Sequence, residues 1–223
     1  MIIMPDFYKQ SLSCQIVSLR EIYLKAFGEK KDGFYVDVGA HDGYYCSNTW
    51  GLAMAGWRGV CFEPMPLLAA KARAIYSTMP KVDIVEAAVG DHEGFATLYT
   101  DGNPTIDLET MQKGPWGPSY DPKKSIQVQL VTLDAVLARK HFPVNFDVLS
   151  IDVEGAELQV LHGIDFKRWF PKMVILETCH DHPIPSYHLH TGALLATMQE
   201  NGFRETYHDA INSIYTRKHE TSL

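Results

Sequence analysis

The chain has 223 residues, which is enough for one sizeable hydrophobic core and short for two domains. Its hydrophobic share of 46% and charged share of 21% are ordinary for a globular protein, and its formal net charge of −7 argues against nucleic-acid binding as the main activity, because phosphate neutralisation needs a basic surface. No stretch approaches the roughly 18 consecutive apolar residues of a membrane span, and the apolar start lacks the basic flank of a signal peptide, so we expect a cytoplasmic protein without membrane insertion.

The N-terminal segment carries apolar residues in steps of three or four, which place them on one face of a helix. They are Leu12, Ile16, Leu19, Tyr23 and Phe27, and Gly28 follows as a C-terminal cap. We therefore expect a helix from Leu12 to Phe27. It lies in an N-terminal helical segment, residues 1–33, which precedes one α/β domain of residues 34–223.

The stretch Phe34–Gly43 reads Phe-Tyr-Val-Asp-Val-Gly-Ala-His-Asp-Gly, a short buried strand that runs into a tight turn. Gly39 and Gly43 let the backbone of this turn approach a ligand closely, as a nucleotide-cofactor site requires. Dinucleotide loops read Gly-x-Gly-x-x-Gly and use the middle glycine to admit the pyrophosphate. This loop has no middle glycine, and its carboxylates Asp37 and Asp42 would repel a pyrophosphate, so it predicts a cofactor without phosphate.

S-adenosylmethionine meets this description, since it carries an adenosine, a sulfonium cation and an amino-acid end but no phosphate. The second predicted strand, Arg58–Glu63, ends in a carboxylate about 20 residues after the glycine turn, which is the offset at which an acidic residue binds ribose hydroxyls. In the helix predicted between them, from Tyr44 to Ala55, Asn48 is a candidate to face the carboxylate of the cofactor. Glu63 is therefore the expected ribose ligand.

The remaining elements alternate between strands and helices. Strands are predicted at 81–89, 95–100, 126–132, 146–151 and 172–177, helices at 64–79, 133–140, 155–163 and 191–201, and a terminal antiparallel hairpin at 203–208 and 212–216. This order gives a doubly wound, mostly parallel α/β sheet. Ala88 and Val89 are small enough for the flat adenine to lie against the backbone, and Asp152 follows a strand at the end of the sheet where ligands bind.

A long connection at residues 101–125 is rich in turn-forming and polar residues. A loop of this length inside a compact domain is usually functional or disordered. Trp116 and Tyr120 within it carry flat faces of the kind that stack on sugar rings. We therefore interpret residues 101–125 as an acceptor-binding loop.

Four segments together carry a family pattern: Val36-Asp-Val-Gly-Ala-His-Asp-Gly43, Gly56-Trp-Arg-Gly-Val-Cys-Phe-Glu-Pro64, Ala87-Ala-Val-Gly-Asp91 and Leu149-Ser-Ile-Asp-Val-Glu-Gly-Ala-Glu157. With them the chain resembles the FkbM family of S-adenosylmethionine-dependent methyltransferases, from about Phe34 to Thr216. The resemblance implies the seven-stranded, Rossmann-like methyltransferase sheet. It also implies O-methylation of a hydroxyl on a sugar, a glycan or a secondary metabolite.

Methyl transfer to an alcohol requires an in-line approach and a general base. Asp152 qualifies by its position, and His180 and His182 qualify because imidazole titrates near neutral pH. We expect His180 or His182 to accept the proton, while Asp152 and Glu177 orient the hydroxyl or the imidazole. The competing interpretation of Asp152 is a structural carboxylate that caps the following helix.

A divalent metal is the alternative interpretation of His180, His182, Asp152 and Glu177, because such an ion can bind and acidify a hydroxyl. The spacing of these residues matches no strong metal signature. The four cysteines are scattered and include no Cys-x-x-Cys pair, so they indicate neither a zinc site nor a disulfide framework. No metal is therefore expected.

The expected cofactor-binding set is Asp37, Gly39, Ala40, Asp42, Gly43, Asn48, Glu63, Pro64, Ala88, Val89 and Asp152. Two other functions fit part of this pattern. A nicotinamide-dependent oxidoreductase would explain the carboxylate that ends the second strand, but it needs the third glycine that the loop lacks. A non-catalytic S-adenosylmethionine-binding module would keep the fold without turnover.

Overall fold

The computed structural model describes residues 7–11, 14, 16–102, 104–108, 112, 121, 123–178 and 185–217, with the backbone alone for 185–190. The larger sheet consists of β1 (Phe34–Val38), β2 (Arg58–Phe62), β3 (Val82–Val85), β7 (Val148–Ile151), β8 (Met173–Glu177), β9 (Phe203–His208) and β10 (Asn212–Arg217). A smaller sheet consists of β4 (Ala88–Val89), β5 (Gly94–Tyr99) and β6 (Ser125–Val131). The helices are α1 (Leu19–Phe27), α2 (Trp50–Met54), α3 (Pro66–Ile75), the 3₁₀ turn η1 (Tyr76–Thr78), α5 (Leu133–Arg139), α6 (Glu157–His162) and α7 (Pro185–Glu200).

The larger sheet has the order β3-β2-β1-β7-β8-β10-β9. Neighbours from β3 to β8 are parallel, and β10 runs antiparallel to both β8 and β9. In the register of the central strands, Val36 of β1 lies between Val60 of β2 and Leu149 of β7. The predicted doubly wound, seven-stranded sheet with a C-terminal antiparallel hairpin is confirmed.

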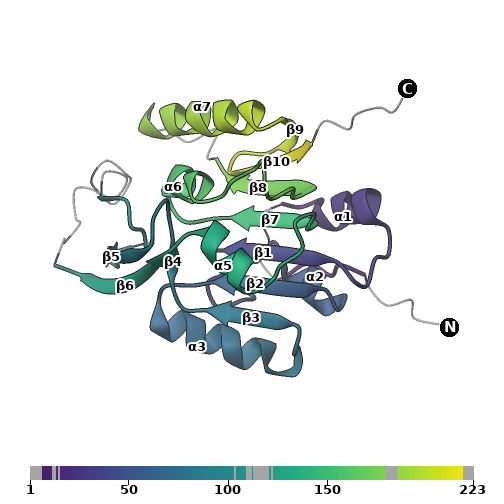
Figure 1. Ribbon diagram of the computed structural model, residues 1–223, viewed down its shortest axis with the longest axis horizontal. Coiled ribbons are helices and arrows are strands. Elements are labelled where there is room, and N and C mark those ends of the chain that lie inside the picture. Colours follow the sequence, from purple (N-terminus) through teal and green to yellow (C-terminus); the bar gives the residue numbers. More distant parts are fainter. Residues whose placement is uncertain are drawn as a thin grey trace.

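Alternate residues of the central strands enter two separate hydrophobic clusters, one on each face of the sheet. Val36 and Val38 pack in a cluster that includes residues of α5, α6 and α7. Tyr35, between them, packs in a cluster with residues of α1, α2 and α3. Figure 1 shows the same arrangement, with α5 and α6 in front of the sheet and α1 and α2 behind it. Burial on both faces explains why these parallel strands read as nearly continuous apolar runs.

The smaller sheet has the order β4-β6-β5 and lies to one side of the larger one, at the left in Figure 1. The single strand predicted at 81–89 is in fact two strands, and that prediction is wrong. β3 stops at Val85, the Ala87 N–H donates to the Val85 carbonyl (3.1 Å), and β4 then pairs with β6. This tight turn redirects the chain from one sheet to the other.

Two helix starts differ from the predictions. α1 begins at Leu19 rather than at residue 12. Ile16, which was predicted to lie in the helix, is fully buried but is not helical. α2 begins at Trp50 rather than at Tyr44. Ser47 Oγ accepts from the Trp50 N–H (3.0 Å), so a side-chain-capped turn replaces the first predicted helical turns. α7 begins at Pro185, earlier than the predicted residue 191.

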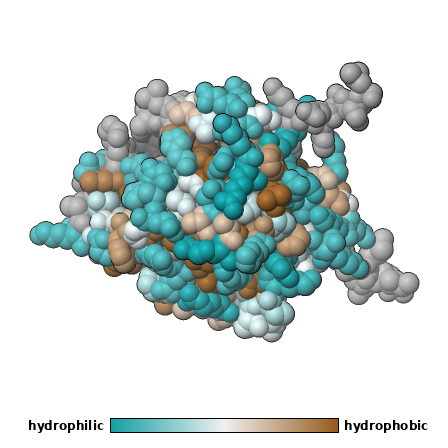
Figure 2. All heavy atoms as spheres, in the orientation of Figure 1, coloured by the Kyte–Doolittle hydropathy of each residue, from teal (hydrophilic) through white to brown (hydrophobic). Residues whose placement is uncertain are grey.

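No helix within the described ranges combines the length and the apolar content needed to cross a membrane. On the face shown in Figure 2, hydrophobic residues form separate patches among hydrophilic ones. Scattered apolar side chains of this kind are usual on protein surfaces.

At the amino ends of β1 and β8, a fully buried carboxylate joins three segments of the chain. Asp147 accepts from the side-chain ammonium groups of Lys30 (2.9 Å) and Lys172 (2.7 Å) and from the Phe34 N–H (2.9 Å). These contacts tie the segment that precedes β1 to the chain between α5 and β8.

Substitution Asp147→Asn should lower the free energy of unfolding by about 2 kcal/mol, because charge-assisted hydrogen bonds to a buried carboxylate are lost. The matched control is Glu86→Gln, which removes an exposed ion pair with Arg73 and should cost less than about 0.5 kcal/mol. Urea denaturation measures both variants. Equal, small effects would contradict a stabilising role for Asp147.

Candidate active site

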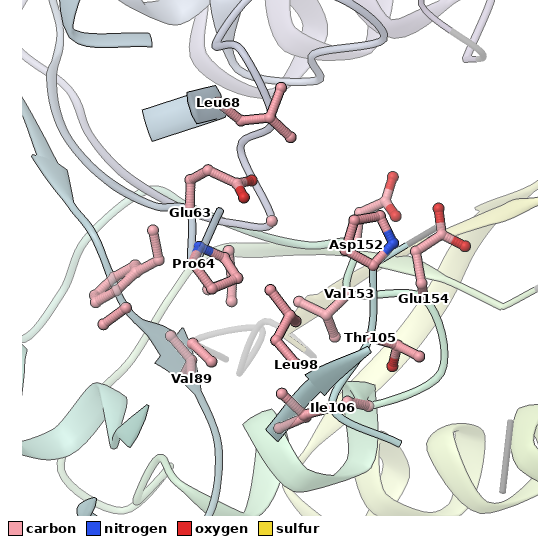
Figure 3. Close-up of a pocket in the computed structure, with 17 residues that line it drawn as sticks. Glu63, Pro64, Leu68, Val89, Leu98, Thr105, Ile106, Asp152, Val153 and Glu154 are labelled. Atoms are coloured by element: carbon pink, nitrogen blue, oxygen red, sulfur yellow. The ribbon is translucent and has the colours of Figure 1, made fainter. Parts of the chain in front are cut away.

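An open pocket lies at the carboxyl ends of β1, β2 and β7, the edge of a parallel sheet where ligands bind. Its space is about 670 Å³, including the part open to solvent. The residues that line it are Val38, Gly39, Phe62, Glu63, Pro64, Leu68, Ala87, Ala88, Val89, Leu98, Pro104, Thr105, Ile106, Asp152, Val153, Glu154 and Ala156 (Figure 3).

The turn after β1 is held against both neighbouring strands. The N–H groups of Gly39 and Ala40 both donate to the Phe62 carbonyl at the end of β2 (3.0 Å each). Gly39 has φ +87°, and a Cβ there would lie 1.7 Å from the carbonyl oxygen of Asp152. A residue with a side chain is therefore excluded at this position both by backbone conformation and by space.

Glu63 presents its carboxylate at one end of the pocket. Its Oε2 accepts from the His41 N–H (2.9 Å) and its Oε1 accepts from the Met65 N–H (2.8 Å), so the side chain is fixed by the glycine turn. Burial raises the pKa of Glu63 to about 7, against the opposing effect of the two N–H donors. A carboxylate oxygen has more than one lone pair, so each can still accept a hydroxyl hydrogen bond.

Asp37 and Asn48 lie behind the pocket rather than on its wall. Asp37 is buried and its Oδ2 accepts from the Thr49 hydroxyl (2.6 Å), which ties β1 to the start of α2. Asn48 is also buried and donates to the Ser150 hydroxyl of β7 (3.4 Å). Their hydrogen bonds connect β1 with α2 and the start of α2 with β7, and neither side chain lines the pocket.

Asp42 and Gly43, two further expected residues of the turn, also have local hydrogen-bond partners. Asp42 Oδ1 accepts from the Tyr44 and Tyr45 N–H groups (2.9 and 2.8 Å). Gly43 has φ +82°, and its carbonyl accepts from the Tyr76 hydroxyl (2.7 Å). Of the expected cofactor-binding set, the pocket wall contains Gly39, Glu63, Pro64, Ala88, Val89 and Asp152, but not Asp37, Ala40, Asp42, Gly43 or Asn48.

A group of three carboxylates lies at the other end of the pocket, with Asp152 and Glu154 on its wall. Oxygen atoms of Asp152, Glu154 and Glu177 lie within 4.8 Å of one another, a spacing that could hold a metal ion. Burial raises the pKa of Asp152 well above its usual range, and the negative charge of Glu154 adds to the effect. Three carboxylates this close together favour binding of a proton or another cation between them.

The competing interpretation of Asp152 is that its carboxylate caps the following helix. In the structure, the carboxylate that binds the N–H groups after Asp152 is that of Glu157. Glu157 is buried, and its Oε1 accepts from the N–H groups of Val153 and Gly155 (3.1 Å each). Glu154, between them, adopts a left-handed backbone with φ 56°. The carboxylate of Asp152 therefore stays at the pocket wall instead of capping α6.

Several expected residues cannot be placed with the pocket. His180, His182, Trp116 and Tyr120 lie outside the described residues. In contrast, Leu98, Thr105, Ile106 and Glu154 line the pocket but were not predicted as site residues. Glu154 belongs to the Asp-Val-Glu-Gly-Ala-Glu motif, which was a usable signal. Thr105 and Ile106 lie in the segment 101–125 that was interpreted as an acceptor-binding loop, and Leu98 comes from a predicted strand that carried no signal.

The sequence matches the family model described as the Methyltransferase FkbM domain over residues 37–205. The chain belongs to the FkbM methyltransferase family. Its members' domain indicates an S-adenosylmethionine-dependent methyltransferase, and the fold implies use of that cofactor. A search of curated proteins finds no match to the sequence.

Solved structures share the fold at low sequence identity. One is a protein assigned as a caffeoyl-CoA O-methyltransferase from Staphylococcus aureus, with TM-score 0.53 and 11% identity over 90% of this chain and 83% of that one. Another is the METTL16 methyltransferase domain, with TM-score 0.52 and 8% identity over 93% of this chain and 68% of that one. At such identities the likeness concerns the fold alone.

Substitution Gly39→Ala should lower the free energy of unfolding by at least about 3 kcal/mol, because the new Cβ would overlap the Asp152 carbonyl. The matched control is Gly202→Ala, which has φ +81° but nothing within 4 Å of the added Cβ, and should cost about 1 to 2 kcal/mol. Chemical denaturation compares the two. If they cost the same, the close approach of the turn to β7 is not a constraint.

Proposed function

We propose that this enzyme transfers the methyl group of S-adenosylmethionine to a hydroxyl group of a sugar, a glycan or a secondary metabolite. The observation that carries the proposal is the charge of the pocket. Carboxylates stand at both of its ends, and its lining, taken over the described residues, includes neither lysine nor arginine. Such a pocket suits a cationic, phosphate-free cofactor and disfavours a phosphorylated one.

The residues of the wall fit the parts of this cofactor. Glu63 would accept hydrogen bonds from the ribose hydroxyls, and Ala88 and Val89 would lie against the base. Asp152 and Glu154 would face positive charge. S-adenosylmethionine supplies, when bound, an electrophilic methyl group on a sulfonium sulfur.

The nicotinamide-dependent alternative receives no support from the pocket. A pyrophosphate needs the N–H cradle of a three-glycine loop, whereas here the N–H groups of Gly39 and Ala40 are bound to the Phe62 carbonyl. The family match also concerns a methyltransferase domain. We therefore retain methyl transfer as the function.

For catalysis we propose that Asp152 contributes to proton removal from the acceptor hydroxyl, with Glu177 orienting it. A general base is worth a factor of roughly 10² to 10⁴, and it is most effective when its pKa lies near the working pH. The raised pKa of Asp152 meets this condition. The expectation from the sequence, in which His180 or His182 accepts the proton and Asp152 orients the hydroxyl or the imidazole, is the second proposal for this step.

A divalent cation held by Asp152, Glu154 and Glu177 is a second candidate for acidifying the hydroxyl, and the spacing of these carboxylates favours it. The two mechanisms separate in one assay. Methyl transfer that disappears in a chelator and returns with magnesium or manganese supports the metal. Transfer that persists in the chelator supports the carboxylate acting by itself.

Substitution Glu63→Gln should weaken binding of S-adenosylhomocysteine by about 1.5 to 3 kcal/mol, because hydrogen bonds to a charged acceptor are lost. Calorimetry measures this, with Glu93→Gln, an exposed partner of Arg139, as the matched control that should bind normally. No detectable binding by the unsubstituted protein would reject the proposed cofactor.

The affinity of the unsubstituted protein should also depend on pH. The pKa of Glu63 is raised to about 7 in the free protein, and the ligand hydroxyls favour the ionised form. Affinity should therefore fall as the pH drops from about 8 to about 6. This component of the pH dependence should be absent in Glu63→Gln. If Glu63→Gln showed the same pH dependence of affinity as the unsubstituted protein, Glu63 would not be the group that binds the ribose hydroxyls.

Substitution Asp152→Asn should reduce methyl transfer to a panel of sugars, glycans and polyketide alcohols by at least roughly 10²-fold. Binding of S-adenosylhomocysteine should persist, which separates a catalytic loss from unfolding. His180→Ala and His182→Ala are made in parallel. Full activity of both Asp152→Asn and His180→Ala would reject this catalytic assignment, and cofactor binding without methylation of any acceptor would favour a non-catalytic module.

A further inference from the structure

One wall of the pocket comes from outside the larger sheet. We call β5, β6 and residues 104–106 the arm. Leu98 on β5, together with Pro104, Thr105 and Ile106, lines the pocket from this arm. In Figure 3, Leu98 and Ile106 lie on the side of the pocket opposite Leu68.

The arm residues are held in place by backbone hydrogen bonds. The N–H group of Tyr99 donates to the carbonyl of Thr105 (2.9 Å), and the N–H group of Thr105 donates to the carbonyl of Tyr99 (3.2 Å). The chain at Thr105 therefore runs antiparallel beside the end of β5. Thr105 is buried, and its hydroxyl oxygen accepts from the Asp107 N–H (3.1 Å). These hydrogen bonds make the wall part of the folded structure.

Packing shows which end of the pocket the arm covers. Leu98 and Ala88 belong to one small hydrophobic cluster, against which Met65 and Ile106 pack. Ala88 lies in the short strand expected to face adenine, and the Met65 N–H binds the Glu63 carboxylate. Leu98 and Ile106 thus pack with Ala88 and with Met65, the residue that binds the Glu63 carboxylate through its N–H group.

We propose that Leu98 and Ile106 bind the nucleoside half of the cofactor, so that the arm is a component of the cofactor site. The inference rests on the cofactor use proposed above and adds a surface to it. The apolar side chains shield one side of the nucleoside from water, while Glu63 binds its hydroxyls. Part of residues 101–125, interpreted from the sequence as an acceptor-binding loop, would then serve the cofactor.

The experiment compares Leu98→Ala, Ile106→Ala and Phe95→Ala by calorimetry. Two ligands are used: S-adenosylhomocysteine and 5′-methylthioadenosine, which keeps the nucleoside and lacks the amino-acid end. Loss of the Leu98 or Ile106 side chain should raise the dissociation constants of both ligands by the same factor, roughly tenfold. Phe95 lies on the same strand but is 78% exposed and outside the pocket wall, so Phe95→Ala should bind both ligands normally.

The outcomes distinguish this inference from the proposed function. If the unsubstituted protein binds neither ligand, the cofactor proposal fails. If it binds both and the Leu98 and Ile106 variants bind equally well, the arm has no part in the site and the inference is overturned. A loss confined to S-adenosylhomocysteine would assign the arm to the amino-acid half and also overturn it. Ile106 is only partly buried, so Ile106→Ala decides the matter if thermal denaturation shows that Leu98→Ala unfolds.

Discussion

The position of the whole site depends on the close approach of two backbones, at Gly39 and at the carbonyl of Asp152. Because no side chain fits between them, the turn after β1 crosses the end of β7 at contact distance. The same turn binds the Phe62 carbonyl through two N–H groups and fixes the Glu63 carboxylate through the His41 N–H. One steric constraint therefore sets the distance between the Glu63 carboxylate, which follows β2, and the Asp152 carboxylate, which follows β7.

Local patterns were sufficient to predict most of the fold and part of the site. Apolar strands with a glycine turn, and an acidic residue at a fixed offset, identified β1, β2 and Glu63, because each of these signals lies within a short stretch of chain. The path of the chain after β3 was not predictable in this way. A strand of two residues carries no periodicity, and the departure of β4 from the larger sheet is decided by its pairing with β6, far along the chain.

Side-chain direction was the other quantity that the sequence did not determine. Asp37 and Asn48 stand in the expected segments, but their side chains point to Thr49 and Ser150 behind the turn. Likewise, the sequence left a cap from Asp152 open as the competing interpretation, and in the structure Glu157 accepts from the N–H groups of the segment after β7. In each case the choice depends on which buried backbone or hydroxyl group needs a partner, and that is known only once neighbouring strands are assembled.

The short length of β3 has a consequence for the outer edge of the larger sheet. β3 is an edge strand of four residues, since the chain leaves at Val85 for the smaller sheet. Unpaired N–H and carbonyl groups on a long edge can template pairing with another chain, and natural proteins limit this by shortening edge strands and by placing charges on them. Asp83, paired with Lys140, supplies such a charge in the middle of β3. The turn that carries β4 toward the pocket thereby also protects this edge against aggregation.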